Sequence, residues 1–426
     1  MKNIEIIEAL DRWNFWNRKI NTGVWREFYL KKLRPLFEMP EIVAATGARR
    51  AGKSTIVLQM IKDLIKEGIN PANTCYVNFE EPKLDQYLSA KGLTQIYESY
   101  LEFFNPKGKV YLFLDEVQLA KNWERFAVSL YDRKENVKIM VTGSSSKLLK
   151  SEVSTLLSGR YISQIIYPLS FAEFLQFSNV SYKGIKRPEI LYYLRQYVEY
   201  GGFPRVVLEK DKTNKKRILV EYFNSILERD IILRYNIKNV RDVKELAIFV
   251  LTNISSQIST YRIEKTLGIS NQNARRYFEY FSSSFLLQFV NLFSFSVKKQ
   301  IYNPQKVFCV DSGLRNAVSF KFSEDIGKLL ENVVFNKLQE EGKEVFFWKN
   351  KTEIDFIARK GYKVAKLYNV CFSLEEKETW EREKASLIKG MSEFKQAKAE
   401  LIYWKGKPRK GKLPFSSTHI LDFLLG

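Results

Sequence analysis

The feature that most constrains this chain is the glycine-rich stretch at residues 47–55, Gly-Ala-Arg-Arg-Ala-Gly-Lys-Ser-Thr. It fits the pattern G-x-x-x-x-G-K-[ST], whose backbone N–H groups and lysine surround nucleotide phosphates. The apolar residues 42–46 predict a buried strand before it, and helical spacing of apolar residues predicts a helix from Thr55 to Lys66. The motif therefore lies between a strand and a helix N-terminus, where a polyphosphate is favoured.

The pattern assigns a role to several residues of this stretch. Gly47 and Gly52 let the backbone close on phosphates, Lys53 would contact the β- and γ-phosphates, and the Ser54 hydroxyl would bind Mg²⁺. The predicted nucleotide-binding residues are Gly47, Ala48, Arg49, Arg50, Ala51, Gly52, Lys53, Ser54 and Thr55.

A second predicted strand, residues 110–114, ends in the acids Asp115 and Glu116. In a P-loop protein, Asp115 would hold Mg²⁺ through water and Glu116 would polarise the attacking water. A third strand at residues 137–143 is followed by serines, of which Ser145 is our choice for a contact with the γ-phosphate. A run of serines is also typical of a helix N-cap, so both interpretations stay open.

Arg160 follows a predicted turn in the sequence Leu-Ser-Gly-Arg. It fits an arginine finger that reaches the γ-phosphate of a neighbouring subunit, and it fits a surface charge equally well.

These motifs occur in a fixed order, and two further motifs follow them in the chain. The stretches concerned are residues 47–54, 114–118, 142–146, 157–160, 167–175 and 200–204. Together they resemble the prokaryotic, especially archaeal, AAA+-like ATPases, in which a P-loop domain precedes a C-terminal domain of unknown function. The resemblance implies a hydrolase that uses ATP and Mg²⁺ and assembles into a homo-oligomer, with a hexameric ring as one option.

The length of 426 residues and the pattern of predicted elements divide this α/β chain into four parts. Residues 1–167 are predicted to form an AAA+-type parallel sheet with an N-terminal helical extension, and residues 168–240 a helical lid. Residues 241–320 are predicted to form a winged helix, and residues 321–426 a PD-(D/E)xK nuclease-like α/β domain.

The winged helix is predicted from helices at residues 243–254, 259–267 and 271–280, followed by strands at 285–290 and 295–302. The residues that this module would present to nucleic acid are Gln272, Asn273, Arg275, Arg276, Lys298 and Lys299. A winged helix that only packs between subunits would show the same pattern.

The last domain places Glu331 on a helix and Asp355 on a strand, as in nucleases that hold Mg²⁺ with acids and stabilise the attacking water with a lysine. The third strand should supply an acid and that lysine, but Asn369 and Cys371 stand there instead. We therefore expect a degenerate domain that has lost cleavage.

Charge and rare residues limit the class of function. The formal net charge of +21 predicts an anionic partner, most often nucleic acid, although lysines kept for solubility would give the same value. The single histidine, His419, disfavours histidine-based catalysis, and the three cysteines show no metal-binding spacing. We see no signal peptide or transmembrane segment and expect a cytoplasmic protein.

The resulting hypothesis is Mg²⁺-dependent ATP hydrolysis by an oligomeric AAA+-like ATPase, coupled to DNA binding or remodelling. One alternative is a nucleotide-gated protein-interaction or signalling switch without DNA coupling. An ATP-dependent nuclease is the other, and the residues at 369 and 371 count against it.

Overall fold

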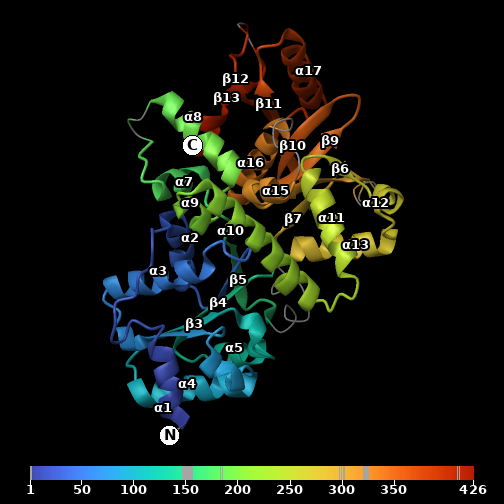
Figure 1. Ribbon diagram of the computed structural model, residues 1–426. Coiled ribbons are helices and arrows are strands. Elements are labelled where there is room, and N and C mark those ends of the chain that lie inside the picture. The colour runs from blue at the N-terminus through green and yellow to red at the C-terminus, as the bar shows by residue number, and fades with distance from the viewer. Residues whose placement is uncertain are drawn as a thin grey trace. The chain divides into compact units, whose positions relative to one another are not determined.

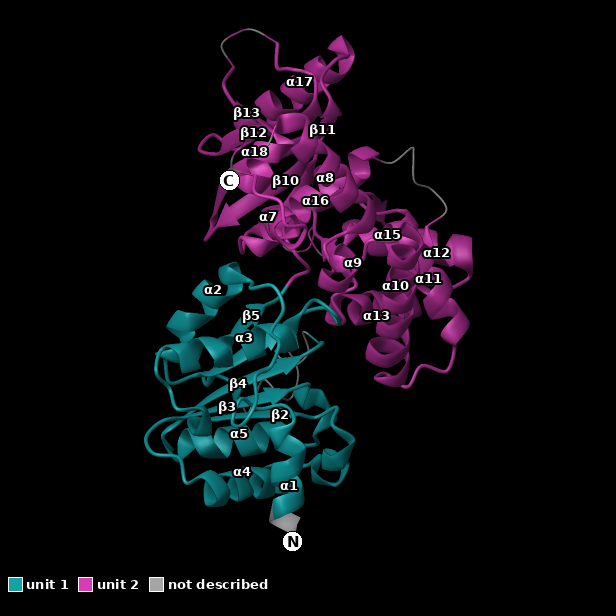
Figure 2. Cartoon of the chain, turned by 60° about the vertical axis from the view of Figure 1, so that its left-hand side comes forward, with its two compact units in different colours: residues 1–166 teal, residues 167–426 magenta. Residues whose placement is uncertain are grey.

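A computed structural model describes residues 2–145, 157–182, 184, 186–296, 298, 300, 303–319, 326–409, 411 and 413–426. The chain divides into two compact units, Met1–Ile166 and Tyr167–Gly426. Figure 1 labels their helices and strands, and Figure 2 shows the two units in different colours.

The first unit is built on a parallel sheet with the strand order β2-β3-β4-β1-β5. Its strands are β1 (Ile42–Thr46), β2 (Thr74–Asn78), β3 (Val110–Asp115), β4 (Val137–Gly143) and β5 (Tyr161–Ile165). Every residue of β1 and β2 is buried, as expected for a parallel sheet covered on both faces. Because β4 lies between β1 and β3, the carboxyl ends of these three strands meet at one edge.

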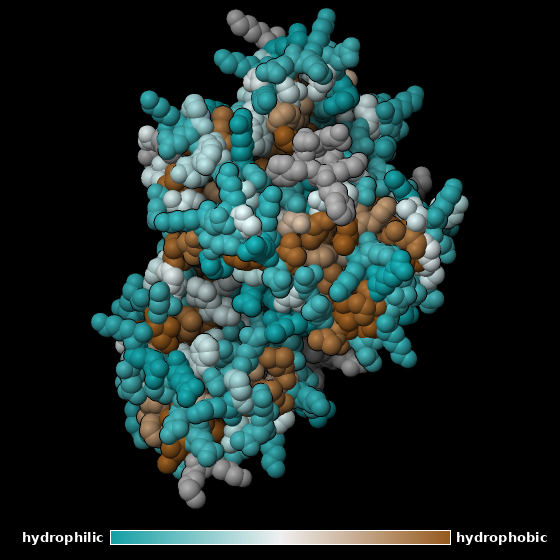
Figure 3. Space-filling view, in the orientation of Figure 1, coloured by the Kyte–Doolittle hydropathy of each residue, from teal (hydrophilic) through white to brown (hydrophobic). Residues whose placement is uncertain are grey.

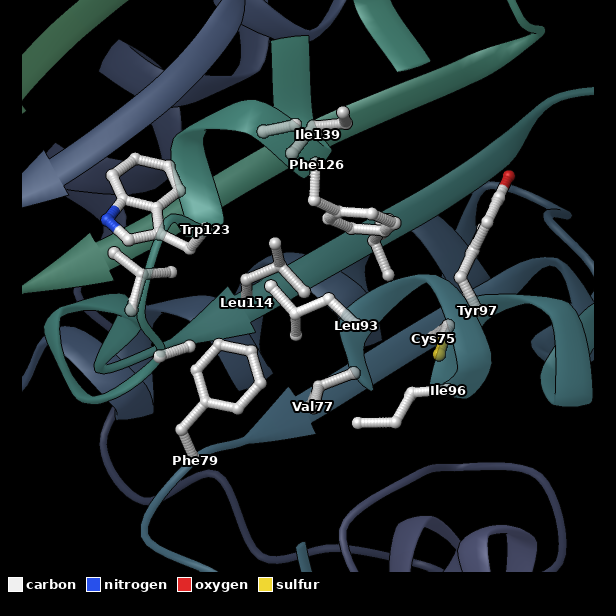
Figure 4. Packing of buried hydrophobic residues seen from close by; sticks show 14 of the residues in the cluster. Cys75, Val77, Phe79, Leu93, Ile96, Tyr97, Leu114, Trp123, Phe126 and Ile139 are labelled. Carbon is white, nitrogen blue, oxygen red and sulfur yellow. The ribbon is translucent and has the colours of Figure 1, made fainter. Parts of the chain in front are cut away.

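Helices cover both faces of this sheet. They are α1 (Lys2–Asp11), α2 (Glu27–Phe37), α3 (Lys53–Lys66), α4 (Ala90–Phe104) and α5 (Trp123–Asp132), with short 3-10 turns at Pro71–Asn73, Pro82–Tyr87 and Val117–Leu119. Leu114 of β3 lies among Leu93 of α4 and Phe126 of α5, as Figure 4 shows. The preceding residue, Phe113, packs in the cluster formed by α2 and α3. Alternate strand residues therefore serve opposite faces.

The segment before β1 is anchored to this unit by polar atoms of its aromatic and amide side chains. Trp13 Nε1 donates to Glu81 at 2.9 Å, and Asn14 Nδ2 donates to the Tyr76 carbonyl at 2.8 Å. Residues 1–38 are thus part of the first unit rather than a separate body.

The second unit begins with helices. They are α7 (Phe171–Phe177), α8 (Arg187–Tyr200), α9 (Pro204–Leu208), α10 (Lys212–Ser225) and the π-helical η5 (Ile226–Leu233). The later helix α15 (Ser312–Val318) packs against α8 and α10. Its N-cap residue, Asp311, accepts hydrogen bonds from the backbone nitrogens of Gly202 and Gly313 at 2.6 and 2.9 Å. A Cβ at Gly201, whose φ is +74°, would lie 1.9 Å from Asp311 Oδ1, so this turn requires glycine.

A small module of helices and short strands follows. It comprises α11 (Val240–Thr252), β6 (Gln257–Ile258), α12 (Thr260–Leu267), α13 (Asn271–Ser283), β7 (Leu287–Val290) and β8 (Gln305–Cys309). The strands form an antiparallel sheet in the order β6-β8-β7.

The strand predicted at residues 295–302 is wrong for the described residues of that stretch, which are not in a strand. Phe295 is 84% exposed, whereas Val307 and Phe308 of β8 are fully buried. The strand that pairs with β7 is therefore the one that can bury apolar side chains, β8.

The chain ends in a mixed five-stranded sheet with the order β13-β12-β11-β10-β9. Its elements are α16 (Ile326–Glu340), β9 (Glu344–Lys349), β10 (Glu353–Lys360), β11 (Lys363–Ser373), α17 (Lys377–Glu393), β12 (Lys398–Lys405), β13 (Ser416–His419) and α18 (Ile420–Leu425). β9, β10 and β11 are antiparallel, and β11, β12 and β13 are parallel.

Two surface properties bear on function. None of the helices in the described part of the chain has the length and apolar character needed to span a bilayer. The face shown in Figure 3 is mainly hydrophilic, and its apolar side chains gather in separate patches.

Candidate active site

The glycine-rich stretch connects β1 to α3, and the strand and helix predicted around it are confirmed. Gly47 begins the loop with φ +150°, and a Cβ there would lie 2.1 Å from the Ile166 carbonyl oxygen. Gly52 has φ +96° and directly precedes Lys53, the first residue of α3. The N-terminus of a 14-residue helix is therefore presented by the loop, and its dipole favours an anion there.

Lys53 lies inside this loop. Its side chain is 3% exposed, and Nζ donates to the carbonyl oxygens of Gly47 and Ala48, both at 3.1 Å. The same ammonium lies 3.9 Å from Glu116 Oε1. The lysine predicted to bind phosphate is thus held between the loop and the acid at the end of β3.

Asp115 is buried at the end of β3 and is surrounded by hydroxyl groups. Tyr76 Oη donates to its Oδ2 at 2.7 Å, Thr142 Oγ1 donates to its Oδ1, and Ser54 is also hydrogen-bonded to it. Burial raises the pKa of Asp115, the nearby Glu116 raises it further, and the three hydroxyls oppose the rise. These hydroxyls come from β2, β4 and α3.

Glu116 is oriented by its neighbours in sequence and space. Its backbone nitrogen donates to Thr142 Oγ1 at 3.0 Å, and Gln118 Nε2 donates to its carboxylate. Its φ of +58° turns the chain sharply after β3.

The donor set at this edge fits a nucleotide with Mg²⁺. The Ser54 hydroxyl and the Asp115 carboxylate supply oxygen, the type of ligand that Mg²⁺ prefers. Lys53 and the N-terminus of α3 supply positive charge for phosphates. The structure thus brings Lys53 and Ser54 of α3 close to Asp115 and Glu116 at the end of β3.

The remaining residues of the glycine-rich loop have distinct environments. Ala48 and Ala51 are buried, and Thr55 is exposed on the first turn of α3. Arg49 Nη1 lies 3.6 Å from Glu80 Oε1, and Arg50 has φ +69°.

Ser145 and Arg160 lie at different ends of the sheet. Ser145 is 3% exposed and comes two residues after β4, at the same edge as the loop. Arg160 precedes β5, and its carbonyl accepts from the backbone nitrogen of Ile42 at the start of β1. Since β1 and β5 are parallel, Arg160 lies at the opposite edge from Lys53. Its guanidinium donates to Asp132 at 2.8 and 3.2 Å.

The residues predicted to contact nucleic acid lie on α13 and after β7. Gln272, Arg275 and Arg276 are exposed, and Asn273 is half-buried beside the Ser270 cap. The opposite face of α13 is buried through Ala274, Tyr277, Phe278 and Phe281. Lys298 is exposed, and Lys299 falls outside the described residues.

The acids predicted for the C-terminal domain also come together. Glu331 Oε2 and Asp355 Oδ1 lie 3.5 and 3.2 Å from Lys306 Nζ. Asn369 Oδ1 accepts from the Asp355 backbone nitrogen at 3.3 Å. Lys306 belongs to β8, and no sequence pattern predicted that it would meet these acids.

Several residues that the sequence motifs did not predict hold Asp115 and the glycine-rich loop in place. Thr142 and Tyr76 hold Asp115, although only Thr142 lies in a stretch that the motif pattern had marked. Arg26 is 1% exposed, and its Nη1 donates to the carbonyl oxygen of Ala51 at 2.8 Å. Its backbone nitrogen donates to Gln59 Oε1 of α3 at 3.1 Å. Arg26 therefore ties the loop to the N-terminal segment, and no local pattern predicts it.

Comparison with known proteins agrees with this geometry. Residues 39–175 match an AAA domain, and residues 191–325 match a domain of unknown function (DUF8612). The chain is 35% identical over 363 residues to the uncharacterized protein MJ1544 of Methanocaldococcus jannaschii, covering 82% of this chain and 78% of that protein. It belongs to the same protein family. An uncharacterized protein of Haemophilus influenzae is 33% identical over 358 residues, which cover 82% of this chain and 87% of that protein.

Two solved structures show weak similarity to this family member. One is the Aeropyrum pernix ORC1 protein in complex with DNA, with a TM-score of 0.34 and 13% identity over 70% of this chain and 92% of that one. The other is C. elegans PCH-2, with a TM-score of 0.28 and 15% identity over 54% of this chain and 73% of that one. Similarity at this level adds nothing to the function proposed below.

The contact of Arg26 with the loop gives a first prediction. Arg26→Ala should weaken binding of a fluorescent ATP analogue about tenfold, since one charge-assisted hydrogen bond contributes roughly 1.5 kcal/mol. The matched control is Arg34→Ala, which removes an arginine that pairs with Asp63 and Glu67 on the surface of α2 and α3. Equal affinities for both folded variants would show that Arg26 does not position the loop.

Proposed function

We propose that this protein is a Mg²⁺-dependent ATP hydrolase whose nucleotide state is coupled to contacts with DNA. The observation that carries the proposal is the grouping of Lys53, Ser54, Asp115 and Glu116 at the carboxyl edge of a parallel sheet. The match of this region to an AAA domain supports it.

Each residue of the site has a role in this proposal. Lys53 and the N-terminus of α3 bind the β- and γ-phosphates, while Ser54 and Asp115 hold Mg²⁺, which neutralises phosphate charge when bound. Glu116 orients the attacking water, and its hydrogen bond from Gln118 fixes the carboxylate. Ser145 remains our candidate for sensing the γ-phosphate.

A role for Arg160 requires a second copy of the chain. Its place at the opposite edge from Lys53 prevents it from reaching a phosphate bound in the same subunit. We therefore propose that Arg160 serves as an arginine finger across a subunit interface, after its ion pair with Asp132 is released.

The DNA contact is assigned to the module that contains α13. We infer that α11 to β8 form a winged helix, because α11, α12 and α13 are followed by the antiparallel pair of strands β7 and β8. The α12–α13 turn ends in Ser270, which accepts from the Asn273 backbone nitrogen as an N-cap. Arg275 and Arg276 are exposed on the next helix, and the net charge of +21 fits an anionic partner.

For the C-terminal sheet we propose a nuclease-like core that does not cleave. The order α16, β9, β10, β11, α17, β12 supports such a core, and Glu331 and Asp355 occupy its acidic positions. Asn369 and Cys371 lack the acid and the lysine that cleavage requires.

Nucleotide binding can be tested directly at Lys53. Lys53→Ala should weaken ATP binding in Mg²⁺ roughly 10- to 100-fold, because a buried ammonium bound to phosphate contributes roughly 1.5–3 kcal/mol. Calorimetric titration measures this, and Lys62→Ala on the same helix is the control. Wild-type affinity in Lys53→Ala would refute the assigned site.

The DNA contact makes a separate prediction. Binding to a short duplex should weaken as salt rises, and Arg275→Glu/Arg276→Glu should reduce affinity at least about tenfold. The matched control is Lys216→Glu/Arg217→Glu, an exposed basic pair on α10 that makes the same change in charge. Fluorescence anisotropy measures both. Equal losses would indicate unspecific attraction, and no DNA binding by the wild type would favour a protein-interaction switch.

A further inference from the structure

Lys306 is a buried cation surrounded by acids of the C-terminal sheet and its first helix. Its Nζ lies 2.7 Å from Glu353 Oε1, 3.2 Å from Asp355 Oδ1 and 3.5 Å from Glu331 Oε2, and the side chain is 4% exposed. The lysine comes from β8, one acid from α16 and two from β10. Elements far apart in the sequence therefore meet at one ammonium group.

The acids outnumber the cation that they surround. Burial alone would lower the pKa of Lys306, but the charges of Asp355, Glu331 and Glu353 raise it above its usual value, so the ammonium stays charged. Burial and the charge of Asp355 raise the pKa of Glu331. A cluster of this kind is stable only while a positive charge occupies its centre.

The other oxygens of the cluster are held in place. Asp355 Oδ2 accepts from the Val370 backbone nitrogen at 2.9 Å. Asn369 bridges from the Asp355 backbone to Glu383, to which it donates at 2.7 Å. Glu331 Oε2 is buried, and the Lys306 ammonium lies 3.5 Å from it.

The acids also line a pocket that opens to solvent. Its volume is about 480 Å³, and Glu331, Glu353, Asp355 and Glu383 lie on its wall. Ions in solution can thus approach the cluster from this side. Within the described part of the chain, no set of three or more histidine, cysteine or acidic side chains is arranged to hold a metal ion.

We propose that the Lys306 ammonium takes the place of a divalent cation in this cluster, so that the C-terminal site is closed to Mg²⁺ and becomes a cation site only when that ammonium is removed. Carboxylate oxygens are the preferred ligands of Mg²⁺, Mn²⁺ and Ca²⁺, and three of them already converge here. The proposal goes beyond ATP hydrolysis, because it concerns residues that the nucleotide site does not use.

The position of Lys306 on β8 gives the site a second property. The same ammonium links the small antiparallel sheet to α16 and β10, so closure of the site in the wild-type protein depends on the packing of β8 against these elements.

The experiment replaces the internal cation with an external one. Lys306→Met keeps most of the side-chain volume but removes the cation that the buried acids share, so the Tm of this variant should fall. Mn²⁺ should restore the Tm and bind at least about tenfold more tightly than to the wild type, because the repulsion between Mn²⁺ and the ammonium is gone. Calorimetry measures Mn²⁺ affinity and thermal unfolding measures the Tm, both without nucleotide. Every protein also carries Asp115→Asn, which removes the proposed cation site of the first unit.

Two controls isolate the cluster. Lys349 pairs with Glu353 at 3.3 Å from the solvent side and is 56% exposed, so Lys349→Met should create no cation site. Adding Asp355→Asn to Lys306→Met should abolish the gained binding.

Two results would overturn the proposal. One is that the protein with Lys306 binds Mn²⁺ and loses this binding when Asp355→Asn is added. The other is that Lys306→Met folds but binds Mn²⁺ no more tightly than the protein with Lys306. Lys306→Gln replaces the methionine variant if the latter does not fold. If neither variant folds even in Mn²⁺, titration of the protein with Lys306 by Mn²⁺ decides. Mn²⁺ binding that depends on Asp355 would refute closure of the site, and the absence of such binding would support closure.

Discussion

Asp115 is only 2% exposed, and the arrangement of the first unit depends on how its buried carboxylate is stabilised. Hydroxyls from Ser54, Tyr76 and Thr142 reach it from three elements. They can do so only because β3 lies between β2 and β4, and because the carboxyl end of β1 delivers α3 to the same edge. A one-residue slip of β2 or β4 would turn Tyr76 or Thr142 to the other face of the sheet.

The same constraint, a charge that is buried and must be neutralised, recurs in the second unit with different solutions. Asp311 is stabilised by backbone N–H groups at the Gly201–Gly202 turn, and burial raises its pKa to about 6. The acids around Lys306 are stabilised by an ammonium from another element of the unit. Of these three sites, the one at Asp115 has neutral hydroxyls as partners beside the N-terminus of α3, an environment that can accept Mg²⁺ and phosphate. This difference is why we assign nucleotide chemistry to the first unit.

The parts of the fold that could be predicted from sequence are local. β1 and β4 appear at the predicted residues because each is an apolar run bounded by turns, and the glycine-rich loop is a contiguous pattern. The strand expected at residues 295–302 is wrong for the described residues of that stretch, because its apolar residues did not reveal which segment would be buried against β7. The nearby stretch with Val307 took that position.

The parts of the sites that could not be predicted join residues distant in sequence. Arg26 meets Ala51, Tyr76 meets Asp115, and Lys306 meets Asp355 through folding of the whole unit. None of these pairs has a spacing that marks it. The glycines at 201 and 202 suggested a turn, but the requirement for them comes from residues distant in sequence. A Cβ at position 201 would meet Asp311, and a Cβ at position 202 would meet the Leu169 carbonyl oxygen.

The measurement that tests the central claim most directly is steady-state ATP hydrolysis in Mg²⁺ by the wild-type protein and by Glu116→Gln. The substitution keeps the size of the side chain and removes its charge, so ATP should still bind while hydrolysis slows at least about 100-fold. Clear hydrolysis by the wild type with this loss in the variant is the predicted result. Hydrolysis by the wild type no faster than by Glu116→Gln would contradict the account.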